Sequence, residues 1–184
     1  MQSGTHLSIQ EYLEGELHSE IRHEYLGGDV YAMAGASIDH NILSLNIASA
    51  LRAHLAGKGC RVFMADVKVR LQIANDDIFY YPDVMVTCDP RETERYFTQY
   101  PKVIIEVLSP ETERTDRREK FLSYLQIETL EEYVLVSQNK MEVTVFRRKE
   151  NWRPEIITAA EQQQRLLSLD FAIPLSSIYE GVKV

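Results

Sequence analysis

Two apolar segments that each contain a single carboxylate constrain this chain most. Residues 80–86 include Asp83, directly after Pro82, and residues 101–109 include Glu106. A charge beside buried apolar surface is costly unless a cation or a metal ion compensates it. We therefore expect two short core strands, lying side by side, whose acidic side chains converge on a divalent metal ion.

The length and composition indicate one globular domain. The 184 residues, of which 45% are hydrophobic and 26% charged, are enough for one substantial core and too few for two. The sequence has no apolar run near the roughly 20 residues of a membrane span, and residues 1–6 lack the layout of a secretory signal. We expect a single domain over residues 1–184, located in the cytoplasm and without membrane contact.

The cysteines suggest no structural cross-linking. Cys60 and Cys88 do not form a CxxC motif, so a disulfide framework and a cysteine-ligated zinc site are both disfavoured. Cys88 follows an apolar segment, and we expect it to be a small core or surface residue.

The charge balance bears on nucleic-acid binding. Twenty basic and 28 acidic residues give a formal charge of −8. A protein that binds many nucleic-acid phosphates normally carries a basic surface patch. The balance argues against tight nonspecific DNA binding. A local patch stays open in the run Arg114, Arg117, Arg118 and Lys120, although such a run is more often a solvated helix face.

Hydrophobic periodicity predicts three helices. Residues 8–19 form a short amphipathic pattern, and residues 37–56 form a longer one with Ser37 as a natural N-cap. Ser109 followed by Pro110 suits an N-cap with proline at the first helical position. The helix that follows is expected to extend to about residue 127.

Alternating and continuous apolar runs predict a mixed β-sheet. Residues 103–108 are apolar throughout except for Glu106, so this strand is expected to be central and covered on both faces. Gly27-Gly28 separates the two halves of an N-terminal hairpin. Further strands are expected within 62–73, which would be half exposed, and at 80–86, 132–137, 141–147, 155–158 and 166–171, with a loop at 90–100. The fold class is therefore α/β or α+β, with a mixed central sheet flanked by helices and extra C-terminal strands that complete the sheet.

Asp83 and Glu106 suit the chemistry of phosphodiester cleavage. That reaction needs a metal ion to polarise the phosphate and to generate hydroxide. Magnesium takes oxygen ligands and keeps several waters, so one or two carboxylates suffice. A lysine close to the attacking water would orient or deprotonate it and offset phosphate charge.

This pattern resembles the PD-(D/E)XK superfamily, which has the restriction-endonuclease-like fold. The resemblance rests on Pro82-Asp83 and Glu106-Val107-Leu108 within an α-β-β-β-α-β order over roughly residues 37–147. It implies a restriction-endonuclease-like core, an Mg²⁺ cofactor with Mn²⁺ as a substitute, and nucleic acid, most often DNA, as the partner. Asp83, Glu106 and the Val107 carbonyl would be the metal ligands.

More narrowly, the chain is similar to a cyanobacterial-type endonuclease family of uncharacterised function. The similarity covers nearly the whole chain and combines several short motifs. These are Glu24-Tyr25-Leu26 before Gly28-Asp29-Val30, His40 opening a helix, Tyr81-Pro82-Asp83-Val84, Ile105 to Pro110, and Asp116 with Lys120.

The position of the catalytic lysine departs from the superfamily pattern. The superfamily has a lysine two residues after the strand carboxylate, and here that residue is Leu108. The resemblance implies that Lys120, on the following helix, takes the role. Asp116 and Lys120 are also an ordinary i,i+4 helix pair. Lys68 and Lys102 are alternative cations, and both would first be interpreted as exposed strand residues.

Two further residues are candidates with structural alternatives. The resemblance suggests that Glu24 supplies another metal ligand or holds the lysine, whereas its place near a hairpin would equally allow solvent exposure. His40, in the first turn of the long helix, would cap, pack or touch a substrate phosphate, and packing is the more common role.

The resulting hypothesis is a magnesium-dependent endonuclease with Asp83, Glu106, Lys120 and Glu24 as catalytic residues. Because such folds often pair to cut both strands, a homodimer is expected by analogy. Two rivals remain. One is a noncatalytic nucleic-acid-binding or protein-interaction module on the same fold, and the other is a metal-dependent hydrolase of a small phosphorylated molecule.

Overall fold

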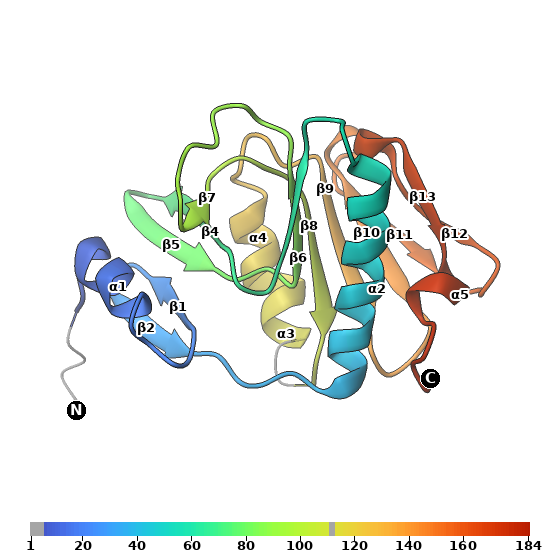
Figure 1. Ribbon diagram of the computed structural model, residues 1–184, viewed down its shortest axis with the longest axis horizontal. Coiled ribbons are helices and arrows are strands. Elements are labelled where there is room, and N and C mark those ends of the chain that lie inside the picture. The colour runs from blue at the N-terminus through green and yellow to red at the C-terminus, as the bar shows by residue number, and fades with distance from the viewer. Residues whose placement is uncertain (1–5, 111–112) are drawn as a thin grey trace.

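The computed structural model describes residues 6–110 and 113–184 and contains three β-sheets (Figure 1). Two larger sheets meet at the centre of the molecule, and a small two-stranded sheet packs against one of them. Within the described residues, none of the helices is long and apolar enough to cross a membrane. The mixed α+β architecture agrees with the predicted fold class.

The central sheet has six strands in the order β11-β10-β9-β8-β6-β3. Strand β8 is parallel to β9, and the other neighbours are antiparallel, so the sheet is mixed as predicted. The strands are β3 (Arg61–Met64), β6 (Val84–Thr87), β8 (Pro101–Leu108), β9 (Glu132–Ser137), β10 (Val143–Arg147) and β11 (Pro154–Ile157). The continuous apolar run of β8 is explained by its place inside the sheet, where both faces are covered.

Helix α2 (Ile38–Leu55) covers one face of this sheet. Ser37 caps it by accepting a hydrogen bond from the His40 N–H, and Leu43, Ile47 and Leu51 form the buried stripe. The opposite face is covered by the helical segment Glu113–Tyr124 (Figure 1). Alternate residues of β8 therefore enter two different cores, and Glu106 points to the side of the second helical segment.

The second sheet has the order β2-β1-β5-β4-β7 and carries helix α1 (Ile9–Glu16). Its strands are β1 (His23–Leu26), β2 (Asp29–Ala32), β4 (Lys68–Ile73), β5 (Asp76–Tyr80) and β7 (Phe97–Thr98). Aromatic rings join helix to sheet, because Tyr12 of α1 lies 4.9 Å from the Tyr25 ring and 5.3 Å from the Phe79 ring. The predicted hairpin is present, and Gly27 and Gly28 both adopt positive φ at its turn.

Two predicted strands are each divided between the two large sheets. Residues 62–73 form β3 in one sheet and β4 in the other, with a bend at Ala65, whose φ is 54°. Residues 80–86 divide in the same way, so Asp83 lies in the connection between β5 and β6 and not on a strand. Apolar patterning does not distinguish one long strand from two short ones that bury their side chains in different sheets.

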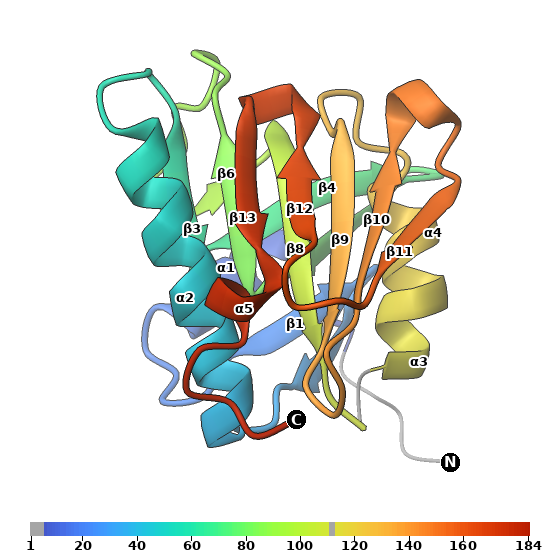
Figure 2. The same ribbon diagram turned by 90° about the vertical axis from the view of Figure 1, so that its right-hand side faces the viewer.

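The C-terminal strands do not complete the central sheet, which corrects the prediction for residues 166–171. Among the described residues, strands β12 (Gln163–Leu166) and β13 (Phe171–Pro174) pair only with each other, and they lie across the same face as α2 (Figure 2). The short helix α5 (Leu175–Ile178) follows. Leu166, Phe171 and Ile173 of this hairpin pack into the core beside α2.

Two smaller predictions also change. The expected loop at 90–100 contains the short strand β7. The helix after Ser109 is described from Glu113, whose N–H donates to the Ser109 carbonyl at 2.9 Å, and Pro110 lies in a turn. The predicted first turn of this helix falls partly on residues 111–112, which lie outside the described residues.

Cys60 and Cys88 form a disulfide, contrary to the expectation from their spacing. The cause is the strand register. Arg61 of β3 pairs with Thr87 of β6, so the residues that flank this pair, Cys60 and Cys88, lie opposite each other. A separation of 28 residues along the chain gives no hint of this pairing.

Hydrogen bonds to Glu132 of β9 connect the C-terminal hairpin β12–β13 to the central sheet. Its carboxylate accepts hydrogen bonds from the Leu167 and Ser168 N–H groups, each at 3.0 Å, and from the Arg147 guanidinium at 3.2 Å. Both Glu132 and Arg147 are buried. Removing Glu132 would leave the Leu167 and Ser168 N–H groups without their acceptor. Among the described residues, Arg147 would then keep carboxylate contacts only with the more exposed Glu150 and Glu155.

We therefore expect Glu132→Ala to lower the free energy of unfolding by about 3–5 kcal/mol in urea titrations. The neighbouring Glu131 provides a matched control, because its side chain is 31% exposed and pairs with Lys102 at 3.0 Å. Glu131→Ala should cost less than about 1 kcal/mol. Equal losses in the two variants would contradict the role given to Glu132.

Candidate active site

Asp83 and Glu106 meet where β6 begins beside β8. The Asp83 N–H donates to Glu106 Oε2 at 3.1 Å, and the Val107 N–H donates to Asp83 Oδ2 at 2.7 Å. The antiparallel register, with Val84 opposite Ile105, brings the two residues together. The structure thus places the two predicted carboxylates side by side, although Asp83 reaches the site from a bend and not from a strand.

Lys120 joins this pair from the opposite helical segment. Its Nζ lies 2.9 Å from Glu24 Oε1, 3.4 Å from Asp116 Oδ1 and 3.6 Å from Glu106 Oε1. Glu24 comes from β1, so the lysine connects the two large sheets as well as the acidic residues. The structure brings together all four residues that the sequence analysis named as catalytic.

A π-helical turn sets the position of Lys120. The helical segment consists of α3 (Glu113–Thr115), the π-helix Asp116–Lys120 and α4 (Phe121–Tyr124). The Tyr133 hydroxyl donates to the Asp116 carbonyl at 3.0 Å, within the π turn. Such π turns are rare and occur frequently at functional sites. Here the turn directs Asp116 and Lys120 inward, where both are buried.

Aromatic side chains enclose the lysine and Glu106. The Tyr124 hydroxyl donates to Glu106 Oε1 at 2.9 Å, and the Tyr80 ring centre lies 5.5 Å from Lys120 Nζ. Tyr124 has no exposed surface. Tyr124 was not among the site residues predicted from the sequence. Its position four residues after Lys120, on the same side of a helix, was the available signal.

The cluster shifts the pKa values of its members strongly. Burial raises the pKa of the Glu106 carboxyl well above its ordinary value; the Lys120 charge opposes this shift, and Asp116 and Asp83 add to it. Burial disfavours the charged Lys120 amine, but Glu106, Glu24 and Asp116 outweigh burial and hold the pKa of Lys120 well above its ordinary value. Lys120 is therefore a fixed positive charge at neutral pH.

His40 also belongs to this site, from the first turn of α2. Its Nε2 lies 3.2 Å from Asp83 Oδ2. Burial disfavours the imidazolium, but contacts with the Asp83 carboxylate and with the Val107 backbone more than compensate and raise the pKa of His40. The histidine thus contacts Asp83 instead of serving as an isolated core residue.

The residues present fit a hard divalent cation. The carboxylates of Glu24, Asp83, Glu106 and Asp116 face one lysine and one histidine, so the cluster retains an excess of negative charge. Among the residues that the structure describes, no three His, Cys, Asp or Glu side chains form a ready-made metal site. Magnesium commonly uses only one or two carboxylates, which Asp83 and Glu106 would supply.

The alternative lysines lie outside this cluster. Lys102 pairs with Glu131 at 3.0 Å. Lys68 is buried and contacts the Tyr81 hydroxyl at 3.2 Å, so its interpretation as an exposed strand residue was wrong. Its strand is covered by α1 on the side where exposure was expected, as the contact between Lys68 and the Tyr12 ring shows.

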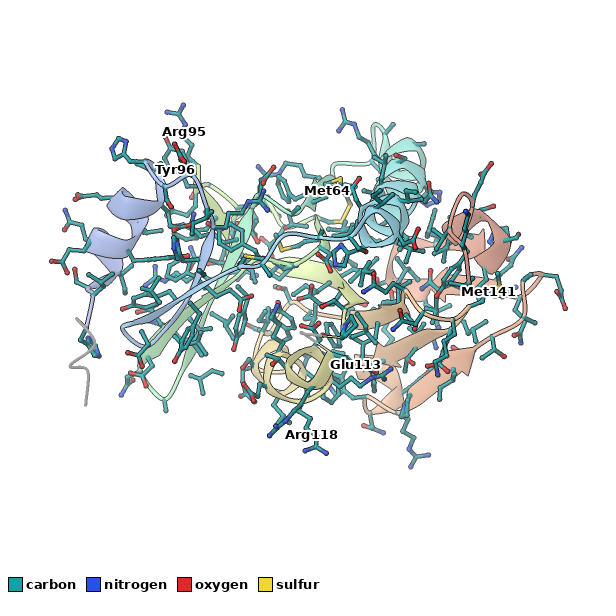
Figure 3. All side chains as sticks on the ribbon, turned by 90° about the horizontal axis from the view of Figure 1, so that it is seen from below. Met64, Arg95, Tyr96, Glu113, Arg118 and Met141 are labelled. Atoms are coloured by element: carbon teal, nitrogen blue, oxygen red, sulfur yellow. A yellow bond between two sulfur atoms is a disulfide. The ribbon has the colours of Figure 1, made fainter. Side chains whose placement is uncertain are left out.

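The predicted basic run does not form one surface patch. Lys120 points into the buried cluster, whereas Arg118 projects outward from the helical segment (Figure 3). Arg117 pairs with Glu113 at 2.8 Å, along the helix surface. Arg114 and Arg118 are exposed, as expected for a solvated helix face.

Comparison with known families agrees with the geometry. The family model described as "Uma2: Putative restriction endonuclease" matches residues 9–176. The chain belongs to the Uma2 family. The whole site described above, from Glu24 to Tyr133, lies inside the part that matches.

Relatives of the Uma2 chain include two uncharacterised proteins of Synechocystis sp. (strain ATCC 27184 / PCC 6803 / Kazusa). The protein slr1290 is 35% identical over 178 residues, which are 96% of this chain and 93% of slr1290. The protein sll1609 is 34% identical over 135 residues, which are 72% of this chain and 75% of sll1609.

A crystal structure with the same fold is that of a "putative nuclease belonging to DUF820" from Anabaena variabilis ATCC 29413. The two structures superpose with a TM-score of 0.77 over 95% of this chain and 98% of that one, at 17% sequence identity. The expected restriction-endonuclease-like fold is thereby confirmed.

The raised pKa of Glu106 gives a pH-dependent stability in metal-free protein. The unfolded carboxyl loses its proton near pH 4.3, whereas the folded one holds it to higher pH. Glu106 therefore costs stability as the pH rises above that value. We expect urea titrations in EDTA to show Glu106→Gln gaining stability relative to the wild type between pH 5 and pH 8.

The exposed Glu128 supplies the control, because Glu128→Gln makes the same substitution outside the buried cluster. A stability difference for Glu106→Gln that does not change with pH would show that Glu106 ionises normally in the folded protein.

Proposed function

We propose that this Uma2 protein is a magnesium-dependent endonuclease that hydrolyses phosphodiester bonds of nucleic acid, with DNA as the first substrate to test. The observation that carries the proposal is a buried cluster in which Glu24, Glu106 and Asp116 surround Lys120 Nζ, with Asp83 held against Glu106. Buried acidic residues in excess of the cations beside them are costly in a purely structural role. Membership of a family whose description is "Putative restriction endonuclease" supports the same reaction.

Asp83, Glu106 and the Val107 carbonyl would hold the Mg²⁺ ion, and Mn²⁺ would substitute for it. When bound, such an ion polarises the phosphate and lowers the pKa of water. Tyr124 keeps the Glu106 carboxylate oriented through its hydrogen bond at 2.9 Å. The Val107 N–H does the same for Asp83 at 2.7 Å.

Lys120 would act as a charge and a hydrogen-bond donor rather than as a base. Its pKa is held well above the ordinary value, so it keeps its proton at neutral pH. A fixed ammonium orients the attacking water and offsets charge that develops on the phosphate. Glu24, at 2.9 Å, holds the lysine in place from the second sheet.

A homodimer would place two such sites on the two strands of a duplex, and it forms part of the proposal by analogy with related folds.

The cytoplasmic location stays a prediction. The Cys60–Cys88 disulfide is of a kind that persists mainly in oxidising compartments.

Metal binding is the first prediction of this proposal. In isothermal titration calorimetry, Mg²⁺ and Mn²⁺ should bind the wild type, and Glu106→Ala should abolish binding. Affinity should increase with pH, because Glu106, whose pKa is raised, must lose its proton to coordinate the ion. Unchanged binding by Glu106→Ala would rule out this metal site.

Cleavage of plasmid DNA with Mn²⁺ is the second prediction. Asp83→Ala and Lys120→Ala should each reduce the rate by about 100-fold or more, because each removes a charge at the reacting phosphate. Lys102→Ala, which removes a lysine paired on the surface with Glu131, should retain full activity. Urea titrations of each variant establish that it is folded at the assay temperature.

Equal cleavage by all three variants would place the activity at another site or in a contaminant. Binding of nucleic acid by the folded wild type without cleavage would instead support the noncatalytic module.

A further inference from the structure

A cavity of about 330 Å³ opens beside the active site. Its walls come from the chain between α1 and β1, from the start of β4, from Tyr81 and from the loop that holds Arg95 and Tyr96. Two chain segments lead from it directly to the active site. Tyr81 precedes Asp83 by two residues, and Arg22 precedes Glu24 by two residues. The two Cα atoms of each pair therefore lie at most about 7 Å apart.

The inner end of the cavity is polar and buried. Lys68 is 6% exposed, and its Nζ lies 3.2 Å from the Tyr81 hydroxyl. That hydroxyl donates to Glu16 Oε2 at 2.6 Å, and Glu16 Oε1 lies 2.8 Å from His23 Nδ1. The Lys68 ammonium carries three N–H donors, and the contact with Tyr81 uses one of them. A group that enters the cavity therefore meets a positioned hydrogen-bond donor.

The mouth of the cavity is apolar and aromatic. Leu17, Ile21 and Tyr96 line it although they are 52%, 56% and 47% exposed. The Arg95 guanidinium lies 5.3 Å from the centre of the Tyr96 ring, and Figure 3 shows the two side chains together beside the chain that follows α1. Large exposed apolar groups that gather around a cavity indicate a surface that binds a ligand.

The charges around the cavity determine which ligand fits. Lys68, Arg22 and Arg95 are balanced by Glu16, Glu20 and Asp66, and Arg22 is paired with Asp66 at 2.6 Å. A lone phosphate gains little from cations that are already balanced, and an aliphatic chain would offer no acceptor to the Lys68 N–H donors that Tyr81 does not use. A neutral planar ring with hydrogen-bonding edges suits both the aromatic mouth and the polar inner end.

One turn of the chain connects this cavity to Asp83. Ala65 adopts a φ of 54°, which is unfavourable for a residue with a side chain. Its N–H donates to the Asp83 carbonyl at 3.1 Å, and its carbonyl accepts from Arg22 at 3.4 Å. Strained residues of this kind gather at functional sites. The backbone of Asp83 is thus held by the same turn that forms a wall of the cavity.

We propose that this cavity receives an unstacked nucleobase of the nucleic acid, adjacent to the phosphodiester group at the active site. Tyr96 and Arg95 stack on the base, and Lys68 donates to an acceptor on its edge. The proposal rests on the proposed function insofar as the ligand is nucleic acid, and it requires neither metal nor cleavage.

The test is fluorescence anisotropy with labelled single-stranded DNA and RNA oligonucleotides in EDTA. Tyr96→Ala should weaken binding roughly 5- to 150-fold, the range for loss of one base–aromatic stack. Tyr96→Phe should bind like the wild type, because it keeps the ring. Ile156→Ala removes a similarly exposed apolar side chain, 59% exposed on β11, and should have no effect.

An abasic scan of the oligonucleotide identifies the base. One abasic position should weaken wild-type binding to the same degree as Tyr96→Ala, and combining the two changes should cause no further loss. Lys68→Met should reduce the preference among bases at that position, with folding checked by urea titration.

Absence of binding by the wild type at low salt would overturn the proposal. So would wild-type affinity in Tyr96→Ala, or additive losses for the variant and the abasic position. The outcome is separable from that of the nuclease proposal. Base-dependent binding that persists in Asp83→Ala, with no cleavage by the wild type, would leave the cavity assignment standing and remove the nuclease.

Discussion

The Lys120 ammonium is the interaction on which this structure depends. It contacts Glu24 of the second sheet, Glu106 of strand β8 in the central sheet and Asp116 of its own π turn. A buried lysine without these partners would lose its charge, and the carboxylates without the lysine would repel one another. The same ion pairs therefore hold the two sheets together and create a site that is rich in negative charge.

The site is built from a central strand and reinforced by its surroundings. Backbone N–H groups orient Asp83 and Glu106, and Tyr124 fixes the remaining oxygen of Glu106. This arrangement leaves little freedom for the carboxylates, as the proposed metal centre requires. The adjoining cavity, with Lys68 and Tyr96, is the proposed binding place of a nucleobase.

Sequence patterns predicted the helices, strands and turns that are determined by residues close together in the chain. The buried stripe of α2 and its Ser37 cap, the glycine turn of the hairpin and the uninterrupted core strand β8 all follow from residues close together in the chain. Prediction failed where the outcome depended on distant partners. The bend at Ala65, the separate C-terminal hairpin and the Cys60–Cys88 disulfide each arise from pairing between segments that are far apart in the sequence.

The sequence by itself determined that Asp83 and Glu106 would be acidic residues in apolar surroundings, and a resemblance between families directed attention to Lys120 and Glu24. Only the tertiary structure decided that these side chains converge, because strand register and a π turn set their distances. The burial of Lys68 was likewise decided there, since the alternating pattern of β4 does not reveal that α1 covers its polar face. The sequence states the chemical type of each side chain. The burial and the ion partners of each charge depend on which distant segments pack around it.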